Sequence, residues 1–110
     1  MREEVVALRV ARVAIFESGT QVQDDDERRS ASLRALLRQV PGFVSGWHLR
    51  APESGRLMSI TVWESEEALE RGEAAVSTRP VDDQRGIQPA VVERWIVEGT
   101  WASTRWSLSA

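Results

Sequence analysis

The 110-residue chain contains no cysteine and only one histidine, His48. Without cysteine there can be no disulfide, no thiolate metal ligand and no cysteine nucleophile. A single histidine excludes a multi-histidine metal centre within one chain, so we expect no metal site. Tyrosine and asparagine are absent as well, whereas tryptophan occurs five times.

The sequence also lacks an excess of positive charge and a long apolar run. Its 14 basic and 17 acidic residues give a net charge of −3, which argues against a nucleic-acid partner because such surfaces need clustered basic residues. No segment is apolar enough to span a membrane, and the N-terminus has no signal-peptide pattern. We therefore expect a cytoplasmic protein with no membrane partner. The length suits one domain.

The most informative stretch is Gly55–Ala75, which reads as a strand followed directly by a helix. Leu57–Trp63 alternates apolar and small polar residues, as strands do, and Ser65 is a good residue to cap the helix that follows. Trp63 is expected to seal the corner between the two elements. Gly72 weakens a helix, so it is expected where another group packs closely.

Periodicity predicts four further elements. Asp24–Glu27 is an acidic run that suits a helix start better than a metal site, because acids there complement the helix dipole, and an apolar stripe continues that helix. The predicted elements are the strand Val5–Phe16, a helix from this run to about Val40, the strand Phe43–Arg50 and the strand Ala90–Glu98. The polar segment 77–89 is expected to be a loop.

Two questions of strand geometry stay open at this stage. Arg9 and Arg12 have opposite parity, so one of them would point inward unless the first strand has a bulge or outruns the core. Regular alternation puts Phe43, Ser45, Trp47 and Leu49 on one face of their strand and Val44, Gly46, His48 and Arg50 on the other. The hairpin register decides whether Trp47 or His48 shares a face with Trp63.

The order β-α-β-β-α-β predicts an α+β, ferredoxin-like domain over residues 1–98, with a four-stranded antiparallel sheet and both helices on one face. The other face still carries apolar side chains and needs cover. A second copy packed sheet against sheet would supply it, so we expect a homodimer, a dimeric α/β barrel. Residues 99–110 form a tail, and its Trp101 and Trp106 are expected to pack on the body or on the partner chain.

Three segments, PGFVSGWHLR, ESGRLMSITVWESEEALE and VVERWIVEG, resemble the antibiotic biosynthesis monooxygenase domain of the dimeric α/β-barrel superfamily. The resemblance covers roughly residues 5 to 98. Members of that family include cofactor-independent oxygenases of polycyclic aromatic polyketides, haem-degrading oxygenases and quinol oxygenases. The resemblance therefore implies the ferredoxin-like dimer and an oxygenase activity, without indicating the substrate.

Residues that some family members use are missing from this chain, which argues against two of the family's activities. Haem-degrading members share the tryptophan at position 63, but they carry a haem-ligating histidine nine or ten residues later, where this chain has Gly72 and Glu73. They also use an asparagine on the first strand, and this chain has none. The histidine that family members place just after the start of the second helix is missing too, which weakens a quinol-type activity.

The activity that the resemblance then implies is a monooxygenase without a cofactor, acting on an aromatic or polyketide-like small molecule in a pocket between sheet and helices. Such a site needs a base and an oxyanion donor in a dry cavity. We assign the base to His48, the only side chain that titrates near neutrality. Arg50 would stabilise the anion, and Trp63 would form a wall and donate its N–H to a substrate carbonyl. Arg79 and Arg85 could close over the pocket.

Two other functions fit the same sequence. The chain could be a non-catalytic dimeric protein that binds a small molecule or acts as an accessory, which the missing family histidine favours. It could also be an interaction protein whose tryptophan-rich tail docks on a partner. Fold alone does not decide between these functions.

Overall fold

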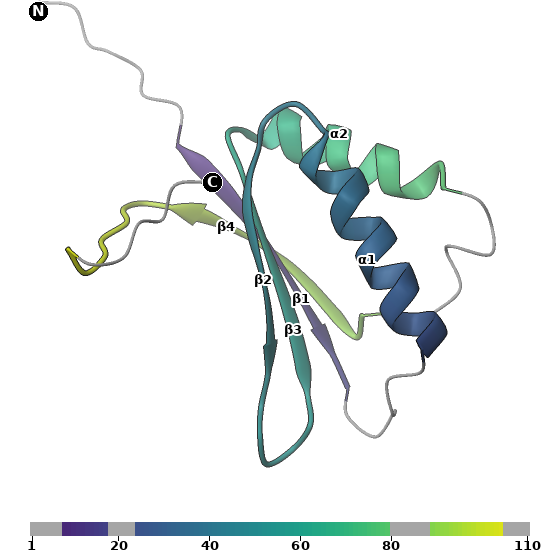
Figure 1. Cartoon of the computed structure of the whole chain (residues 1–110). Coiled ribbons are helices and arrows are strands. Elements are labelled where there is room, and N and C mark those ends of the chain that lie inside the picture. The colour runs from purple at the N-terminus through teal and green to yellow at the C-terminus, as the bar shows by residue number, and fades with distance from the viewer. Residues whose placement is uncertain (1–7, 18–23, 80–88, 105–110) are drawn as a thin grey trace, which may run out of the picture.

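The computed structural model describes residues 8–17, 24–79 and 89–104, and these form a four-stranded sheet with two helices (Figure 1). All strand pairs are antiparallel, and the strand order is β2-β3-β1-β4. The α+β, ferredoxin-like prediction is therefore confirmed. The elements in chain order are β1 (Arg9–Phe16), α1 (Asp24–Arg38), β2 (Phe43–Arg50), β3 (Leu57–Trp63), α2 (Glu66–Ser77) and β4 (Val91–Val97).

Most predicted boundaries agree with the structure to within two residues. Helix α1 ends at Arg38 rather than near Val40, because the amides of Gln39 and Val40 bond three residues back and tighten the last turn before Pro41. Strand β4 is one residue shorter at each end than predicted. Strand β1 begins at Arg9, so the predicted strand was too long by Leu8 at its start. The described residues do not include residues 5–7 of that prediction, Arg85 or Trp106. No helix in the described part of the chain could cross a membrane.

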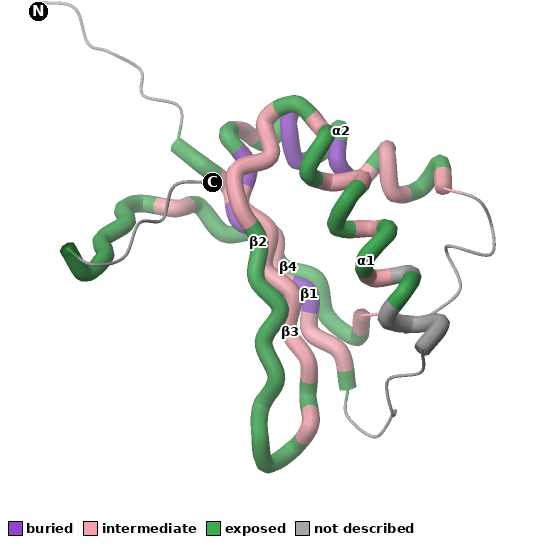
Figure 2. Tube along the Cα trace, viewed as in Figure 1, coloured by how far each residue is buried: buried purple, intermediate pink, exposed green. Residues whose placement is uncertain are grey.

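Both helices lie on one face of the sheet, and the core is concentrated where α2 meets the end of β3 (Figures 1 and 2). The core cluster consists of Trp63, Ala68 and Leu69, and apolar side chains of α1, β1 and β2 pack against it. The predicted cap is confirmed, since the Ser65 hydroxyl accepts from the Ala68 amide at 3.1 Å.

The buried side chain of Trp63 accounts for the glycine at position 72 in the middle of α2. The indole is 1% exposed, as predicted for the residue that seals the strand-helix corner. The far edge of its six-membered ring approaches α2 so closely that a Cβ on Gly72 would stand 2.6 Å from its Cζ2 atom and 2.9 Å from Cζ3. The close approach of the Trp63 ring therefore requires glycine at this position of the helix. This confirms the prediction that another group packs closely against Gly72.

The β2–β3 register settles which side chains share the face of Trp63. His48 pairs with Ser59 and Trp47 with Ile60, so His48 is on the helix-facing side and Trp47 is on the other. The regular alternation predicted for β2 is wrong at its start. A register shift between Phe43 and Ser45, a β-bulge, turns Phe43 to the helix-facing side, where its ring meets Trp63 edge-on at 5.2 Å.

The face of the sheet away from the helices is mostly apolar, with Glu93 and Arg9 as its charged residues, and neither helix covers it. We call this surface the open face. Registers place on it Ala11, Val13, Ile15, Trp47, Leu49, Met58, Ile60, Val62, Val91, Trp95 and Val97. Trp95 is 57% exposed there, and Trp101 in the segment after β4 is 89% exposed. The described part of the tail therefore does not bury Trp101 on its own body.

Candidate functional site

Four polar residues occupy neighbouring positions of three adjacent strands on the helix-facing side of the sheet. Ser59 and Thr61 of β3 are flanked by His48 of β2 and Arg12 of β1, because Ser59 pairs with His48 and Thr61 pairs with Arg12. Their other strand neighbours are small. Ala14 pairs with Ser59, and Gly46 pairs with Thr61. We call His48, Ser59, Thr61 and Arg12 the polar patch.

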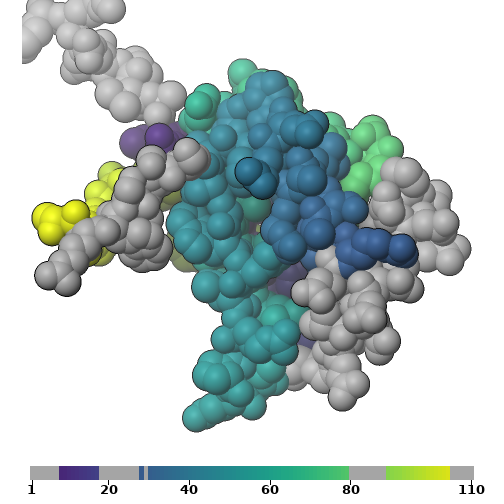
Figure 3. Space-filling view, in the orientation of Figure 1, coloured from purple at the N-terminus to yellow at the C-terminus, as the bar shows by residue number. Residues whose placement is uncertain are grey.

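Helix α1 lies near the His48 end of the polar patch, since the charge of Arg34 acts on His48, whereas Arg12 at the other end bonds to Glu73 of α2. Figure 3 shows α1 against the hairpin, with the hairpin tip extending past the helix. Ala14 is only 2% exposed, so the middle of this side is well covered. Ser59 and Thr61 are half-buried and His48 is exposed at the outer strand. A ligand held here would contact covered hydroxyls on one side and a more accessible imidazole on the other.

His48 is suited to remain a neutral base. Partial burial, and to a smaller extent the positive charge of Arg34 on α1, lower the pKa of His48 from its ordinary value of 6.5. Both causes disfavour the charged imidazolium. At neutral pH the ring is therefore unprotonated and can accept a proton, which is the state that a general base needs.

A hydrogen bond connects Trp63 to the polar patch. Its indole Nε1–H donates to Thr61 Oγ1 at 3.0 Å, so the donor that the sequence analysis assigned to a substrate carbonyl is used within the protein. A hydroxyl that accepts this bond still has its own proton to donate. Thr61 is therefore the group that can present a hydrogen-bond donor to a ligand, and Trp63 positions it.

Of the two arginines of β1, Arg12 is the one that faces the helices. Strand β1 pairs regularly with both neighbours, and Arg12 points toward α2 while Arg9 lies at the exposed end of the strand. Arg12 and Arg94 are direct cross-strand partners, a like-charge pair that would be unfavourable alone. Glu73 accepts from both, at 3.4 Å from Arg12 Nε and 2.6 Å from Arg94 Nη2.

The structure brings two of the three predicted site residues together. His48 and Arg50 are on the same side of β2, and Arg50 pairs with Leu57 near the hairpin tip. Trp63 is four residues from Ser59, or about 13 Å along the strand at 3.3 Å per residue. It therefore acts at the other end of the polar patch rather than beside His48.

The sequence analysis did not single out Ser59, Thr61 or the Glu73 cluster. The signal for the two hydroxyls was present, since alternation along Leu57–Trp63 puts them on the face of Trp63. No comparable signal links Glu73 to Arg12, because that contact joins residues 61 positions apart. Among the described residues, no group of three or more histidine or acidic side chains could hold a metal ion.

Several solved structures have the same fold as this chain. SnoaB, a cofactor-independent oxygenase from Streptomyces nogalater, matches with a TM-score of 0.61 and 20% identity, over 89% of this chain and 99% of SnoaB. A heme-degrading protein from Mycobacterium tuberculosis matches at 0.62 and 21% identity, over 86% and 100% of the two chains. A Chloroflexus aurantiacus protein named for antibiotic biosynthesis monooxygenases matches at 0.57 and 12% identity, over 86% and 97%.

The similarity is one of structure rather than of sequence. No family model matches the sequence, and no curated protein is significantly similar to it. Where the resemblance indicated that haem-degrading members carry their ligand, Gly72 packs against Trp63 and Glu73 is bonded to two arginines. The chain therefore shares the fold of the antibiotic biosynthesis monooxygenase-type proteins.

Proposed function

We propose that the chain is a cofactor-independent monooxygenase that acts on an aromatic or polyketide-like small molecule, bound at the polar patch of a cytoplasmic homodimer. The observation that carries the proposal is the placement of His48, whose pKa its surroundings lower, directly across from Ser59 and on the same face of the sheet as Thr61. The shared fold with a cofactor-independent oxygenase is consistent with it.

The proposed reaction oxidises a ring CH₂ beside a carbonyl, as in the keto form of a polycyclic phenol. His48 takes one C–H proton, and the resulting enolate passes an electron to dioxygen. The two radicals combine into a peroxide, which takes a proton back from the imidazolium. Loss of the second C–H proton then breaks the O–O bond. One oxygen atom becomes the new C=O and the other leaves as water, so the CH₂ group and O₂ balance the ketone and H₂O.

The other groups of the patch stabilise the enolate. Thr61 can donate its hydroxyl proton to the oxyanion, and the Trp63 indole fixes the direction of that hydroxyl. Arg12 is half-buried on the strand beside Thr61, and Glu73 accepts from its Nε atom, so the guanidinium would add positive charge at this end of the patch. Arg50, two residues beyond His48, would attract an acidic substituent at the outer end.

Replacing His48 by alanine is expected to reduce kcat for oxygen consumption by about 100-fold or more, as loss of a general base does. The wild-type rate should fall on the acid side with a midpoint below pH 6.5, because protonation removes the base and the pKa of His48 is lowered from its ordinary value. The measurement is oxygen uptake with a panel of polycyclic phenols as a function of pH.

Ser54→Ala, in the exposed hairpin turn, is the matched control and should be fully active. If His48→Ala keeps wild-type activity and the same pH profile, His48 is not the base. If the panel binds at the polar patch but no compound is oxidised, the chain is a binding or accessory protein of this fold, and the oxygenase proposal fails.

A further inference from the structure

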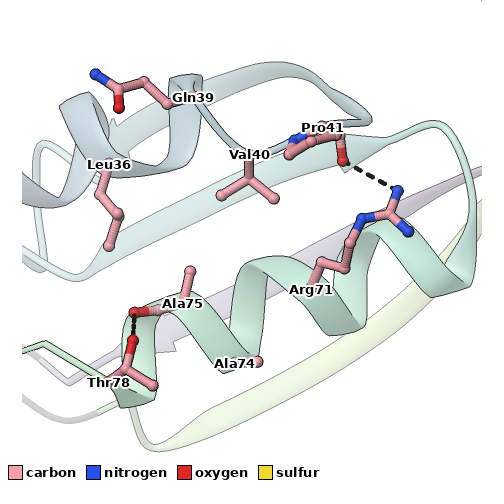
Figure 4. A pocket seen from close by; sticks show the side chains of 8 residues that line it. All are labelled: Leu36, Gln39, Val40, Pro41, Arg71, Ala74, Ala75 and Thr78. Atoms are coloured by element: carbon pink, nitrogen blue, oxygen red, sulfur yellow. Dashed lines mark hydrogen bonds between the residues drawn. The ribbon is translucent and has the colours of Figure 1, made fainter.

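A hollow lies between α1 and α2, and its lining shares no residue with the polar patch. Figure 4 shows this groove between the two helices. Its volume is about 550 Å³, within the usual range for small-molecule sites. We call it the interhelical groove, and its lining residues are Leu36, Gln39, Val40, Pro41, Arg71, Ala74, Ala75 and Thr78.

The floor of the groove is apolar because Leu36, Val40 and Ala75 line it. The small side chain of Ala75 leaves space between the two helices. Ala75 points toward α1 while Leu36 and Val40 point toward α2 (Figure 4). From Arg71 to Thr78 the groove follows α2 for about 10 Å, at 1.5 Å per residue. At the far end, the Thr78 hydroxyl donates to the Ala75 carbonyl at 2.9 Å and is already used.

Arg71 is the one charged residue of the lining. Its Nη2 atom donates to the Pro41 carbonyl at 3.2 Å, which holds the guanidinium against the α1–β2 turn. No described carboxylate, including Glu67 one turn earlier, lies within 4 Å of its nitrogens. A guanidinium has five N–H donors in a planar fork that suits a carboxylate, so most of its donors are available to a ligand.

We propose that the interhelical groove binds a monocarboxylate with an apolar body, such as a medium-chain fatty acid. The carboxylate pairs with Arg71, and the apolar body lies along Leu36, Val40 and Ala75. Charge complementarity selects this ligand, because the groove combines an apolar floor with a single positive group that has no described counter-ion. A neutral molecule would leave the guanidinium without its partner, and a short anion would leave the floor uncovered.

The test is titration of decanoate and of decanol into methyl-labelled protein, followed by NMR. Decanoate should shift the methyl signals of Leu36, Val40 and Ala75. It should bind at least tenfold more tightly than decanol. Arg71→Gln should remove that difference by weakening decanoate about tenfold, and Arg56→Gln, which removes the same charge at the exposed hairpin turn, should bind as wild type. Ala75→Leu fills the groove and should prevent binding of both compounds.

Three results would overturn the proposal. The first is equal affinity for decanoate and decanol in the wild-type protein, or no binding of either at millimolar concentration. The second is an Arg71→Gln variant that binds decanoate as tightly as wild type. The third is a set of shifts centred on the open face or on the polar patch. Because the readout is binding at named methyl groups, it is independent of whether the protein consumes oxygen.

Discussion

Gly72→Ala is expected to lower the free energy of unfolding by about 2 kcal/mol, although alanine is the better helix former. Helix propensity alone would raise stability by about 1 kcal/mol. The new Cβ would stand 2.6 Å from Trp63 Cζ2, far inside the 3.5–4.0 Å at which carbon atoms attract each other. Trp63 is 1% exposed and cannot move without repacking the core, and overpacking costs about 1–3 kcal/mol or more. Chemical denaturation measures the change.

Two comparisons separate packing from propensity. Ala74→Gly, at an exposed position of the same helix, should cost about 1 kcal/mol and shows that propensity operates normally in α2. Trp63→Phe shortens the ring, so Gly72→Ala should cost less in that background than in wild type, a coupling that a double-mutant cycle detects. A Gly72→Ala protein more stable than wild type would contradict the close contact with Trp63.

Ile60→Arg is expected to dissociate the proposed homodimer and raise its dissociation constant by more than about 100-fold. Ile60 is in the middle of the open face, where Val13 and Trp47 pair with it from either side. A guanidinium there would have to be desolvated among apolar side chains, and the acid of the same row, Glu93, lies two strands away, so the charge is costly to bury. The fold of the subunit should survive, because this side chain points away from both helices. Sedimentation velocity measures the association.

Ala51→Arg adds the same charge in the exposed turn between β2 and β3 and should leave the association unchanged. If Ile60→Arg associates like wild type, the open face is not the contact between subunits. If the wild-type protein is itself monomeric at micromolar concentration, another group must cover Trp47 and Trp95.

The sequence predicted the elements whose evidence is local. Alternation over Leu57–Trp63, the Ser65 cap and the unusual glycine at position 72 were each interpretable within one turn or strand, and the structure confirms all three. The bulge at Phe43 was not predictable, because a bulge changes the parity of a strand without leaving a signature in these residues. Trp101 is exposed in the described chain, so its packing against a partner chain stays a prediction.

The candidate site was less predictable than the fold. His48 was identifiable because it is the only residue of its kind, but its face depended on the hairpin register. Trp63 was recognised, whereas its hydrogen bond to Thr61 required knowledge of the rotamer of the indole. The bond from Arg12 to Glu73 joins β1 to α2, and only the packed layers bring such distant residues together.

The most direct test of the proposed oxygenase is turnover under labelled dioxygen by protein that mass spectrometry shows to be free of haem, flavin and metal. The account predicts consumption of oxygen with at least one polycyclic phenol of the panel. It also predicts one labelled oxygen atom in the product and loss of that turnover in His48→Ala. Binding of the same phenols at the polar patch without consumption of oxygen would contradict the account.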